Sequence, residues 1–220
     1  MRNWPILFFL GALAIVLSWI SLSGLHAQPG RAFILNLATS LIGSVVTYLI
    51  FDRLIGLKEK ERDKRTQLIR DLHGMDRELR DLALQEMIKH GWLVDADLRG
   101  VNLEGTALLR GKDLTRANLT RAKLFGADLS EAKLDGAILY DADLHGAILI
   151  GCSLEAANLA EADLRECFLE RANLRACDLT RADLSGAKLK DANTDKAKID
   201  GTKLAGADLT RTEIAHLLDI

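Results

Sequence analysis

A leucine that recurs every five residues restricts the fold of this chain more than any other feature. The series runs from Leu109 to Ile214 in 22 consecutive pentads, with Thr194 as its one polar member. A period of five matches neither the α-helix, at about 3.6 residues per turn, nor the β-strand, at about two. It therefore predicts a coil that turns a corner every five residues and points one apolar side chain inward from each side.

The other four positions of each pentad fit the same coil. The residue two places before the leucine is nearly always alanine, as in Ala117-Asn-Leu-Thr-Arg and Ala122-Lys-Leu-Phe-Gly, and a small side chain suits a crowded inner corner. The remaining three positions are mostly polar residues or glycine, as outward positions should be. Leu98 and Leu103 precede the series and have the same pentad pattern. One extra residue between them and Leu109, which we assign to Thr106, shifts the register.

These residues resemble the pentapeptide-repeat family, whose pattern is A-(D/N)-L-x-x. The resemblance implies an all-β right-handed quadrilateral β-helix with four pentads per coil. The 24 leucine-type centres of this chain would then form about six coils, stacked as a solenoid whose ends need caps. We expect this solenoid over residues 92–214 and a C-terminal cap over residues 215–220.

Two long uncharged runs precede the repeat. Residues 3–30 and residues 32–51 contain no Asp, Glu, Lys or Arg. A helix of about 20 residues crosses the hydrocarbon core of a lipid bilayer. We therefore expect a transmembrane helical hairpin over residues 1–56, with spans at about 5–23 and 32–51.

The distribution of cations predicts the orientation of this hairpin. Six Lys and Arg residues follow the second span, whereas the short loop between the spans offers only Arg31. The positive-inside rule places both termini and the repeat domain in the cytoplasm, so we expect a multi-pass protein of a bacterial inner membrane. Cleavage of residues 1–27 as a signal peptide is the alternative, and it also leaves the repeat domain in the cytoplasm.

Residues 57–91 are expected to form one amphipathic, highly charged connecting helix. Its apolar stripe consists of Leu68, Leu72, Met75, Leu79 and Leu82. The stripe either forms a coiled coil that makes the protein a homodimer, or packs on the first coil of the solenoid or on a membrane helix. It is shorter than the three or so heptads that indicate a coiled coil, which favours packing within the chain.

The repeat also places the unusual residues. Cys152, Cys167 and Cys177 all occupy the alanine position, and no two of them are four pentads apart, the spacing of vertical neighbours. We therefore expect three small buried side chains, with neither a disulfide nor a metal site. Thr194 buries a hydroxyl that needs a partner, which predicts a weaker coil near the C-terminus.

Steps of four pentads predict the columns on the outer surface. One column holds Leu108, Asp128, Ile148, Phe168 and Lys188, with Ile150 on the same side. Leu108, Ile148, Ile150 and Phe168 form the candidate partner-binding patch, because an exposed apolar patch can mark an interface. The alternative is that the connecting helix folds back and covers it.

A second column consists of Asp143, Asp163 and Asp183, with His145 and Arg165 beside it. Stacked like charges are expected to raise the pKa of some of these carboxyl groups. We interpret them as solvated surface residues of the repeat and not as a cation site.

The sequence contains no motif of catalysis, and we expect neither an enzyme, a cofactor nor a metal. The predicted function is a membrane-tethered scaffold that binds the lipid bilayer through its spans and a protein partner through its solenoid. The family resemblance offers an alternative, a DNA-mimicking protein that interacts with gyrase. Mimicry needs a strongly acidic rod, whereas residues 95–220 carry 17 Lys and Arg against 22 Asp and Glu. We therefore favour the scaffold, and we do not expect nucleic acid as a partner.

Overall fold

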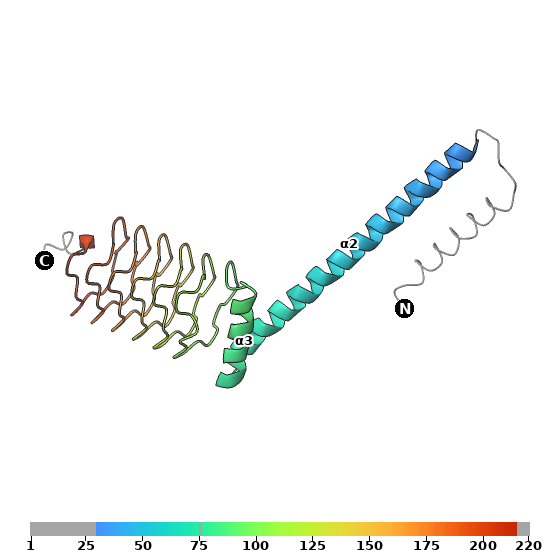
Figure 1. Ribbon diagram of the computed structural model, residues 1–220. Coiled ribbons are helices and arrows are strands. Elements are labelled where there is room, and N and C mark those ends of the chain that lie inside the picture. Colours follow the sequence, from blue (N-terminus) through green and yellow to red (C-terminus); the bar gives the residue numbers. More distant parts are fainter. Residues whose placement is uncertain (1–29, 75, 215–220) are drawn as a thin grey trace. The chain divides into compact units, whose positions relative to one another are not determined.

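The computed structural model describes residues 30–74 and 76–214, with side chains from residue 43 onward. The chain divides into two compact units, Met1–Glu61 and Arg62–Ile220. Two helices, α2 and α3, precede a stack of coils (Figure 1). The predicted first span and the predicted C-terminal cap lie outside the described residues.

Helix α2 is continuous from Gly30 to Leu72 and contains the predicted second span, 32–51. Its large apolar side chains between residues 46 and 57 are not buried within the chain. These side chains are Val46, Tyr48, Ile50, Phe51, Leu54, Ile55 and Leu57, exposed by 48% to 63%. Among the residues that the structure describes, no helix is both long and apolar enough to cross a membrane.

The segment predicted as one connecting helix contains the end of one helix and the whole of another. Helix α2 ends at Leu72, and α3 runs from Arg77 to Lys89. Asp76 caps α3, because its carboxylate accepts hydrogen bonds from two backbone N–H groups of the first turn. The prediction of a single helix over residues 57–91 is therefore wrong at His73, Gly74 and Asp76, which are not helical.

The break also divides the predicted apolar stripe. Leu72 is fully buried, whereas Leu79 and Leu82 are exposed by 58% and 56%. Helix α3 instead buries a face made of Ala83, Leu84 and Met87. Once the helix is interrupted, the rotation of its second part is set by these three residues and no longer by the stripe.

The two helices close the first coil of the solenoid. Leu72, Leu84 and Met87 belong to the same buried cluster as the inward leucines of the coils. The backbone N–H of Asn102 donates a hydrogen bond of 3.2 Å to the carbonyl of Leu72, which joins the end of α2 to the coil. Trp92 packs against this cluster as well. The apolar edge of the first coil is thus kept from water.

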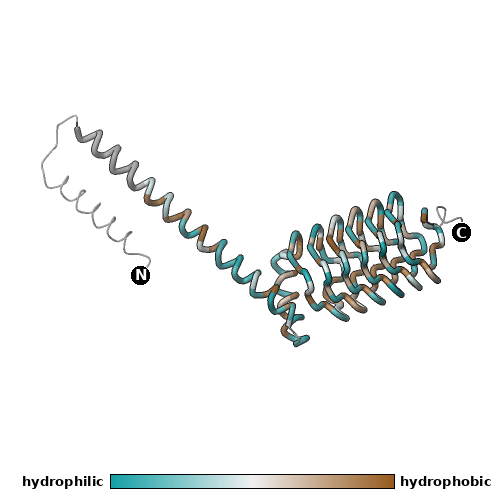
Figure 2. The backbone as a smooth tube through the Cα atoms, turned by 180° about the vertical axis from the view of Figure 1, so that it is seen from behind, coloured by the Kyte–Doolittle hydropathy of each residue, from teal (hydrophilic) through white to brown (hydrophobic). Residues whose placement is uncertain are grey.

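The coils have four sides, as the repeat predicts. Parallel β-bridges join residues 20 positions apart, such as Asp113 with Lys133 and Ser153 with Asn173. Inward leucines donate backbone hydrogen bonds to the next coil, as from Leu134 to the carbonyl of Ser153 at 2.7 Å. Figure 2 shows these coils stacked in layers, with apolar and polar residues alternating along each one.

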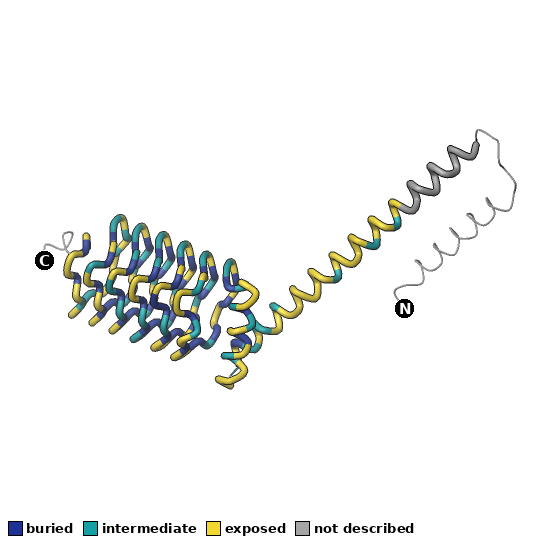
Figure 3. The backbone as a smooth tube through the Cα atoms, viewed as in Figure 1, coloured by how far each residue is buried: buried dark blue, intermediate teal, exposed yellow. Residues whose placement is uncertain are grey.

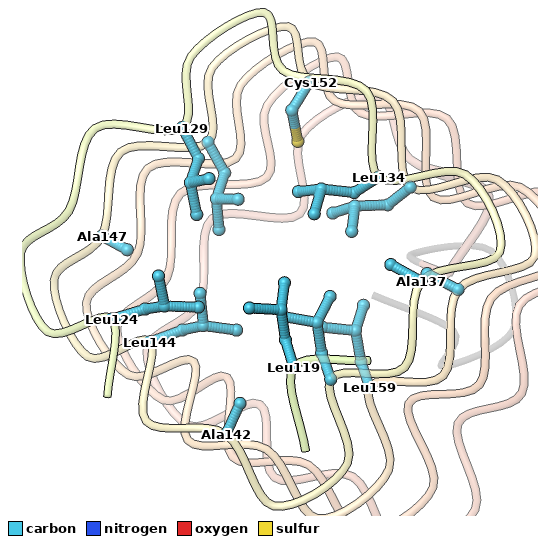
Figure 4. Close-up of a cluster of buried hydrophobic side chains, with 14 of the residues drawn as sticks. Leu119, Leu124, Leu129, Leu134, Ala137, Ala142, Leu144, Ala147, Cys152 and Leu159 are labelled. Atoms are coloured by element: carbon cyan, nitrogen blue, oxygen red, sulfur yellow. The ribbon is translucent and has the colours of Figure 1, made fainter. Parts of the chain in front are cut away.

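The axis of the solenoid is filled by the leucines and the small residues between them. Figure 4 shows Leu119, Leu124, Leu129 and Leu134 pointing to the centre from the four sides of a coil. All four are fully buried, and Figure 3 shows the same alternation of buried and exposed residues along each coil. Burying one leucine side chain contributes roughly 1.5–3 kcal/mol, so every coil makes a comparable contribution to the core.

The corners of the coil depend on left-handed backbone conformations. Every corner residue, two places after the leucine, has a positive φ, as in Arg116 at 56° and Gly126 at 61°. The turn closes through a hydrogen bond of 3.0 Å from the N–H of Ala117 to the carbonyl of Leu114, and a type II turn requires a positive φ at its third residue. Among the described residues, fourteen with positive φ are not glycine, so side chains are tolerated there at a local energetic cost.

The register shift before the main series is confirmed, but the extra residue is not Thr106. Bridges in the first coil join residues 21 apart, as Asn102 and Lys123, whereas later bridges join residues 20 apart. Thr106 is buried in an alanine position, and its carbonyl accepts a hydrogen bond from the N–H of Asp128 at 2.8 Å. The extra residue therefore lies between Thr106 and Leu109.

The hydroxyl of Thr194 has the partners that its burial requires. Its Oγ1 donates to Oε2 of Glu213 at 3.0 Å and accepts a hydrogen bond from the N–H of Ile214 at 3.2 Å. Of the inward residues that follow, Ile199 and Leu204 are only partly buried, whereas Leu209 and Ile214 are buried. The hydroxyl of Thr194 is satisfied and therefore does not account for the partial burial of Ile199 and Leu204.

We predict that exchanging glycine and alanine at two corners changes stability in opposite directions. Ala156 and Gly126 both have positive φ, and a Cβ added at Gly126 would meet nothing within 4 Å. Ala156→Gly should raise the free energy of unfolding by about 1 kcal/mol and Gly126→Ala should lower it by about 1 kcal/mol. Chemical denaturation followed by circular dichroism measures both, and changes of the same sign would contradict the conformational explanation.

Candidate functional site

The predicted apolar patch lies along one side of the solenoid. Parallel bridges join Asp128 to Ile148, Ile148 to Phe168, and Phe168 to Lys188. These outward residues therefore follow one another in consecutive coils, separated by about 4.8 Å. The prediction that residues four pentads apart are vertical neighbours is therefore confirmed for Asp128, Ile148, Phe168 and Lys188.

Two of the predicted residues line a shallow hollow of about 380 Å³. Ile148 and Ile150 supply its large apolar side chains, and Ile150 is 39% exposed. The remaining lining residues are Arg110, Asp128, Ser130, Glu131, Gly151 and Arg171. All of them belong to the solenoid, so within the unit Arg62–Ile220 the hollow is not covered by a helix, in contrast to the alternative that the sequence left open.

The charged groups around the hollow are available to a ligand. Arg171 forms no ion pair with any residue that the structure describes. Arg110 and Glu131 are 3.6 Å apart and both largely exposed, and such surface pairs contribute only about 0–1 kcal/mol. The carboxylate of Asp128 accepts a hydrogen bond from the N–H of Ser130 at 2.9 Å. The hollow thus combines an apolar surface with accessible groups of both charges.

The other two predicted residues lie outside the hollow. Phe168 is in the next coil, with the ammonium group of Lys188 4.5 Å from the centre of its ring. A cation–π contact at an exposed site contributes about 0.5–1 kcal/mol. Leu108 is partly buried and packs against the core, because it lies next to the extra residue of the first register. Leu108 therefore contributes little to the outer patch.

The sequence placed Asp128 in the same column as Ile148, but the other polar residues of the hollow were not predicted. Glu131 and Arg171 are corner residues in the same vertical series as Gly151, and Arg110 is in the series of Ile150. The same steps of four pentads could have found them. The predicted patch left out the corner positions, whose side chains also reach across that face.

Two of the three aspartates in the column, Asp163 and Asp183, are paired with the cations Arg165 and Lys203. Arg165 donates two hydrogen bonds to Asp163, at 2.8 and 2.6 Å, and holds its pKa below the usual range. The pKa of Asp183 is also lowered, first by the hydroxyl of Ser185. The prediction that stacking raises these pKa values is therefore wrong, since hydrogen bonds outweigh the repulsion. Within residues 30–74 and 76–214, no group of His, Cys, Asp or Glu is placed to hold a metal ion.

The three cysteines are buried in the core, as predicted. Cys152, Cys167 and Cys177 are free thiols, and Figure 4 shows Cys152 pointing into the coil. Burial raises the pKa of each thiol to about 12. The thiol of Cys167 also donates to the carbonyl of Leu144 at 2.8 Å. Thiols with such a high pKa are poor nucleophiles at neutral pH, so these side chains act as core residues.

An ionic cluster joins α2 to α3 at the closed end of the solenoid. Lys64 of α2 binds the carboxylate of Glu86 in α3, and His90 lies 3.1 Å from the same oxygen. The hydrogen bond from Lys64 and then the one from His90 lower the pKa of Glu86 to about 2. Trp92 stacks on His90 with ring centres 4.4 Å apart. The cluster fixes α3 beside the end of α2.

Comparison with known proteins identifies the repeat. A family profile described as pentapeptide repeats, in eight copies, matches residues 107–139, 137–175 and 177–213. A pentapeptide repeat protein from Nostoc PCC 7120, alr5209, is 30% identical, and the match covers 56% of this chain and 93% of that protein, with a TM-score of 0.35. This chain belongs to the pentapeptide-repeat family. Proteins of this family adopt a right-handed quadrilateral β-helix, the four-sided stack described above.

Other pentapeptide-repeat proteins are similar over a comparable length. HetL, involved in the regulation of heterocyst differentiation in the cyanobacterium Nostoc sp. strain PCC 7120, is 28% identical, covering 55% of this chain and 83% of its own, with a TM-score of 0.35. QnrB1, a plasmid-mediated fluoroquinolone resistance protein, is 18% identical, covering 56% and 85%, with a TM-score of 0.32. No curated protein matches the chain significantly.

We predict that Glu86→Gln lowers stability in a pH-dependent way. The pKa of Glu86 is about 2 in the folded chain, below the value near 4.3 of an unfolded glutamate, so its contribution is complete above about pH 5 and is lost as the pH falls towards 2. The stability difference between the wild type and Glu86→Gln should therefore shrink over this range.

Chemical denaturation at several pH values measures this difference. Glu104→Gln removes an exposed carboxylate outside the cluster and is the matched control. A difference for Glu86→Gln that stays constant from pH 6 to pH 3 would show that the ionic cluster does not stabilise the fold.

Proposed function

We propose that this pentapeptide-repeat protein is a membrane-tethered, non-enzymatic scaffold that presents its solenoid to the cytoplasm and binds a protein partner. The observation that carries the proposal is the hollow over Ile148 and Ile150. Ile148 and Ile150 give the hollow an apolar centre, and the polar residues around them provide hydrogen-bonding and charged groups. Apolar centres with polar rims are typical of protein-binding surfaces.

The solenoid supports this function because it is already ordered before a partner binds. The leucines and small residues on its axis form one buried cluster from the capping helices to the last coil. Neighbouring coils hold one another through backbone ladders on every side. A partner therefore meets a preorganised surface, and binding costs little conformational entropy on this side.

The tether is supported by the composition and exposure of the segment before the solenoid. Residues 32–51 are uncharged, and apolar side chains from Val46 to Leu57 are exposed along α2. Cations follow residue 51, beginning with Arg53 and continuing with Lys58, Lys60 and Arg62. An apolar stretch that ends in cations is the pattern of a span that leaves the membrane on its cytoplasmic side, in our proposal that of a bacterial inner membrane.

The surface charges do not favour mimicry of DNA. Acidic residues of the coils are paired with cations from neighbouring coils or pentads. Such pairs join Arg116 to Asp95 at 2.6 Å, Arg121 to Asp141 at 2.9 Å, Arg175 to Glu155 at 2.9 Å and Arg211 to Asp191 at 3.1 Å. This alternation cancels the continuous negative field that a duplex backbone presents, so the scaffold remains our proposal.

We predict that a photo-crosslinking residue at position 150, in the full chain and in native membranes, captures a specific protein. Ile148→Lys should reduce this capture about tenfold or more, because it places a charge in the apolar centre of the contact. Ile138 is exposed by 38% on another side of the coil, and the same crosslinker there is the matched control. Equal capture from position 138, or crosslinks only between copies of this chain, would contradict the proposed binding surface.

We also predict that the full chain resists alkaline carbonate extraction and remains in the membrane pellet, because apolar spans hold it there. Added protease should remove the repeat domain in inverted inner-membrane vesicles and should leave it intact in spheroplasts. Extraction into the supernatant would contradict the tether. Cleavage in spheroplasts would instead retain the tether and contradict the cytoplasmic orientation.

A further inference from the structure

The outer faces of the solenoid use one recurring device to satisfy backbone donors. From residue 113 to the end of the described coils, every Asp or Asn in the position before an inward residue accepts a hydrogen bond from the N–H two residues later. Examples are Asp128 with Ser130 at 2.9 Å and Asn158 with Ala160 at 3.0 Å. The short side chains of Asp and Asn suit this contact, so an oxygen on the outer face caps each of these N–H groups.

The side of the solenoid that carries the hollow lacks this cap in three consecutive coils. The residues in the capping position have side chains that cannot accept a hydrogen bond, and they are Ile148, Phe168 and Lys188. Within the described residues, the backbone N–H groups two places later form no hydrogen bond, and they belong to Ile150, Glu170 and Lys190. No other side of the described solenoid leaves such N–H groups unpaired in neighbouring coils. This side therefore presents backbone donors to a ligand.

One of these uncapped residues lies at the hollow together with an unpaired cation. Ile150 and Arg171 both line the hollow, and they belong to neighbouring coils about 4.8 Å apart. The side chain of Arg171 forms neither an ion pair nor a hydrogen bond with any residue that the structure describes. The corner that follows Ile150 is Gly151, which has no side chain that could cover the N–H group. The N–H of Ile150 and the guanidinium of Arg171 are therefore both available to one ligand.

The acidic groups of the hollow lie at its other end. Asp128 and Glu131 belong to the coil before that of Ile150, whereas Arg171 belongs to the coil after it. The carboxylate of Asp128 already caps a backbone N–H, and the carboxylate of Glu131 is paired with an arginine. Glu170 is next to Arg171 in the sequence but does not line the hollow. The end of the hollow at Arg171 is thus complementary to a negative charge.

We propose that the hollow binds an acidic side chain of the protein partner, whose carboxylate accepts a hydrogen bond from the N–H of Ile150 and pairs with Arg171. The inference rests on the proposed function, because it names what the partner contributes to the same hollow. The partner's carboxylate takes the role that an Asp or Asn of this chain has in the capped pentads. An apolar residue beside that carboxylate covers Ile148 and Ile150.

A carboxylate fits these groups better than a neutral acceptor does. A backbone carbonyl or an amide could accept from the N–H of Ile150, but neither would neutralise Arg171. Hydrogen bonds between an ionised donor and an ionised acceptor are about twice as strong as those between neutral groups. The charge therefore determines which partner segments bind, and the apolar centre adds contact area.

The test uses a defined peptide, acetyl-Ala-Leu-Asp-Leu-Ala-amide, and the full chain in detergent micelles with isoleucine labelled by nitrogen-15. The amide signal of Ile150 is assigned in nuclear magnetic resonance spectra by its loss in Ile150→Val. We expect millimolar peptide to shift this signal in a saturable way. The same peptide with Asn in place of Asp should bind about fivefold more weakly or less, because it cannot neutralise Arg171.

Two substitutions at position 148 test the role of the backbone donor. Ile148→Asn supplies the missing cap from within the chain, as Asn158 does for Ala160. It should slow hydrogen exchange of the Ile150 amide and weaken binding of the Asp peptide about tenfold. Ile148→Gln removes the same apolar side chain, but its amide is one methylene further from the backbone. It should therefore leave exchange at Ile150 unchanged and weaken binding less than Ile148→Asn does.

Substitution of the arginine tests the role of the charge. Arg171→Gln should reduce the preference for the Asp peptide over the Asn peptide from about fivefold to none. Arg181→Gln is the matched control, because Arg181 is also an exposed corner residue with a φ of 59° and lies on another side of the coil. Unchanged thermal unfolding of both variants would show that the fold is intact.

Several outcomes would overturn the inference. Equal binding of the two peptides would do so, as would a preference for Asp that survives Arg171→Gln, or equal effects of Ile148→Asn and Ile148→Gln. The crosslinker at position 150 separates this inference from the proposed function. Specific capture that Arg171→Gln leaves unchanged would keep the binding surface and reject the carboxylate, whereas the absence of specific capture and of peptide binding would reject both.

Discussion

The corner at every fifth residue is the constraint on which the rest of the structure depends. Because the backbone turns there through a left-handed residue, the chain returns to the same side after four corners, as from Asp113 to Lys133. Ladder hydrogen bonds and inward leucines can form only after that return. The core, the flat sides and the vertical columns are therefore all consequences of one repeated turn, and the fold tolerates wide variation on its outside.

Much of this could be predicted from the sequence, because the repeat specifies its own geometry. The five-residue period of the repeat predicts the inward leucines and the buried cysteines. The spacing of 20 residues between stacked positions predicts that Ile148 and Phe168 are neighbours. The repeat does not predict features outside it, such as the break between α2 and α3. The division between α2 and α3 depends on which side chains the first coil can bury, and the period of the stripe does not contain that information.

The electrostatic predictions failed for a related reason. A column of aspartates predicts repulsion when it is considered alone, but the reach and direction of Arg165 decide the outcome by bringing two N–H groups onto Asp163. The same holds for the hollow, where Arg171 and Glu131 extend from corners over the neighbouring face. Backbone positions in a solenoid are predictable from sequence, whereas the paths of long side chains across its surface are decided by their neighbours.

The two ends of the solenoid differ, which gives the rod a direction. The first coil is covered by α2 and α3, whereas Ile199 and Leu204 near the other end are only partly buried. Because each coil contacts only its neighbours, whole turns can be gained or lost at the C-terminal end without moving the hollow or the helices. The length of such a protein can therefore vary in evolution in increments of one turn, while the end that α2 and α3 cover stays unchanged.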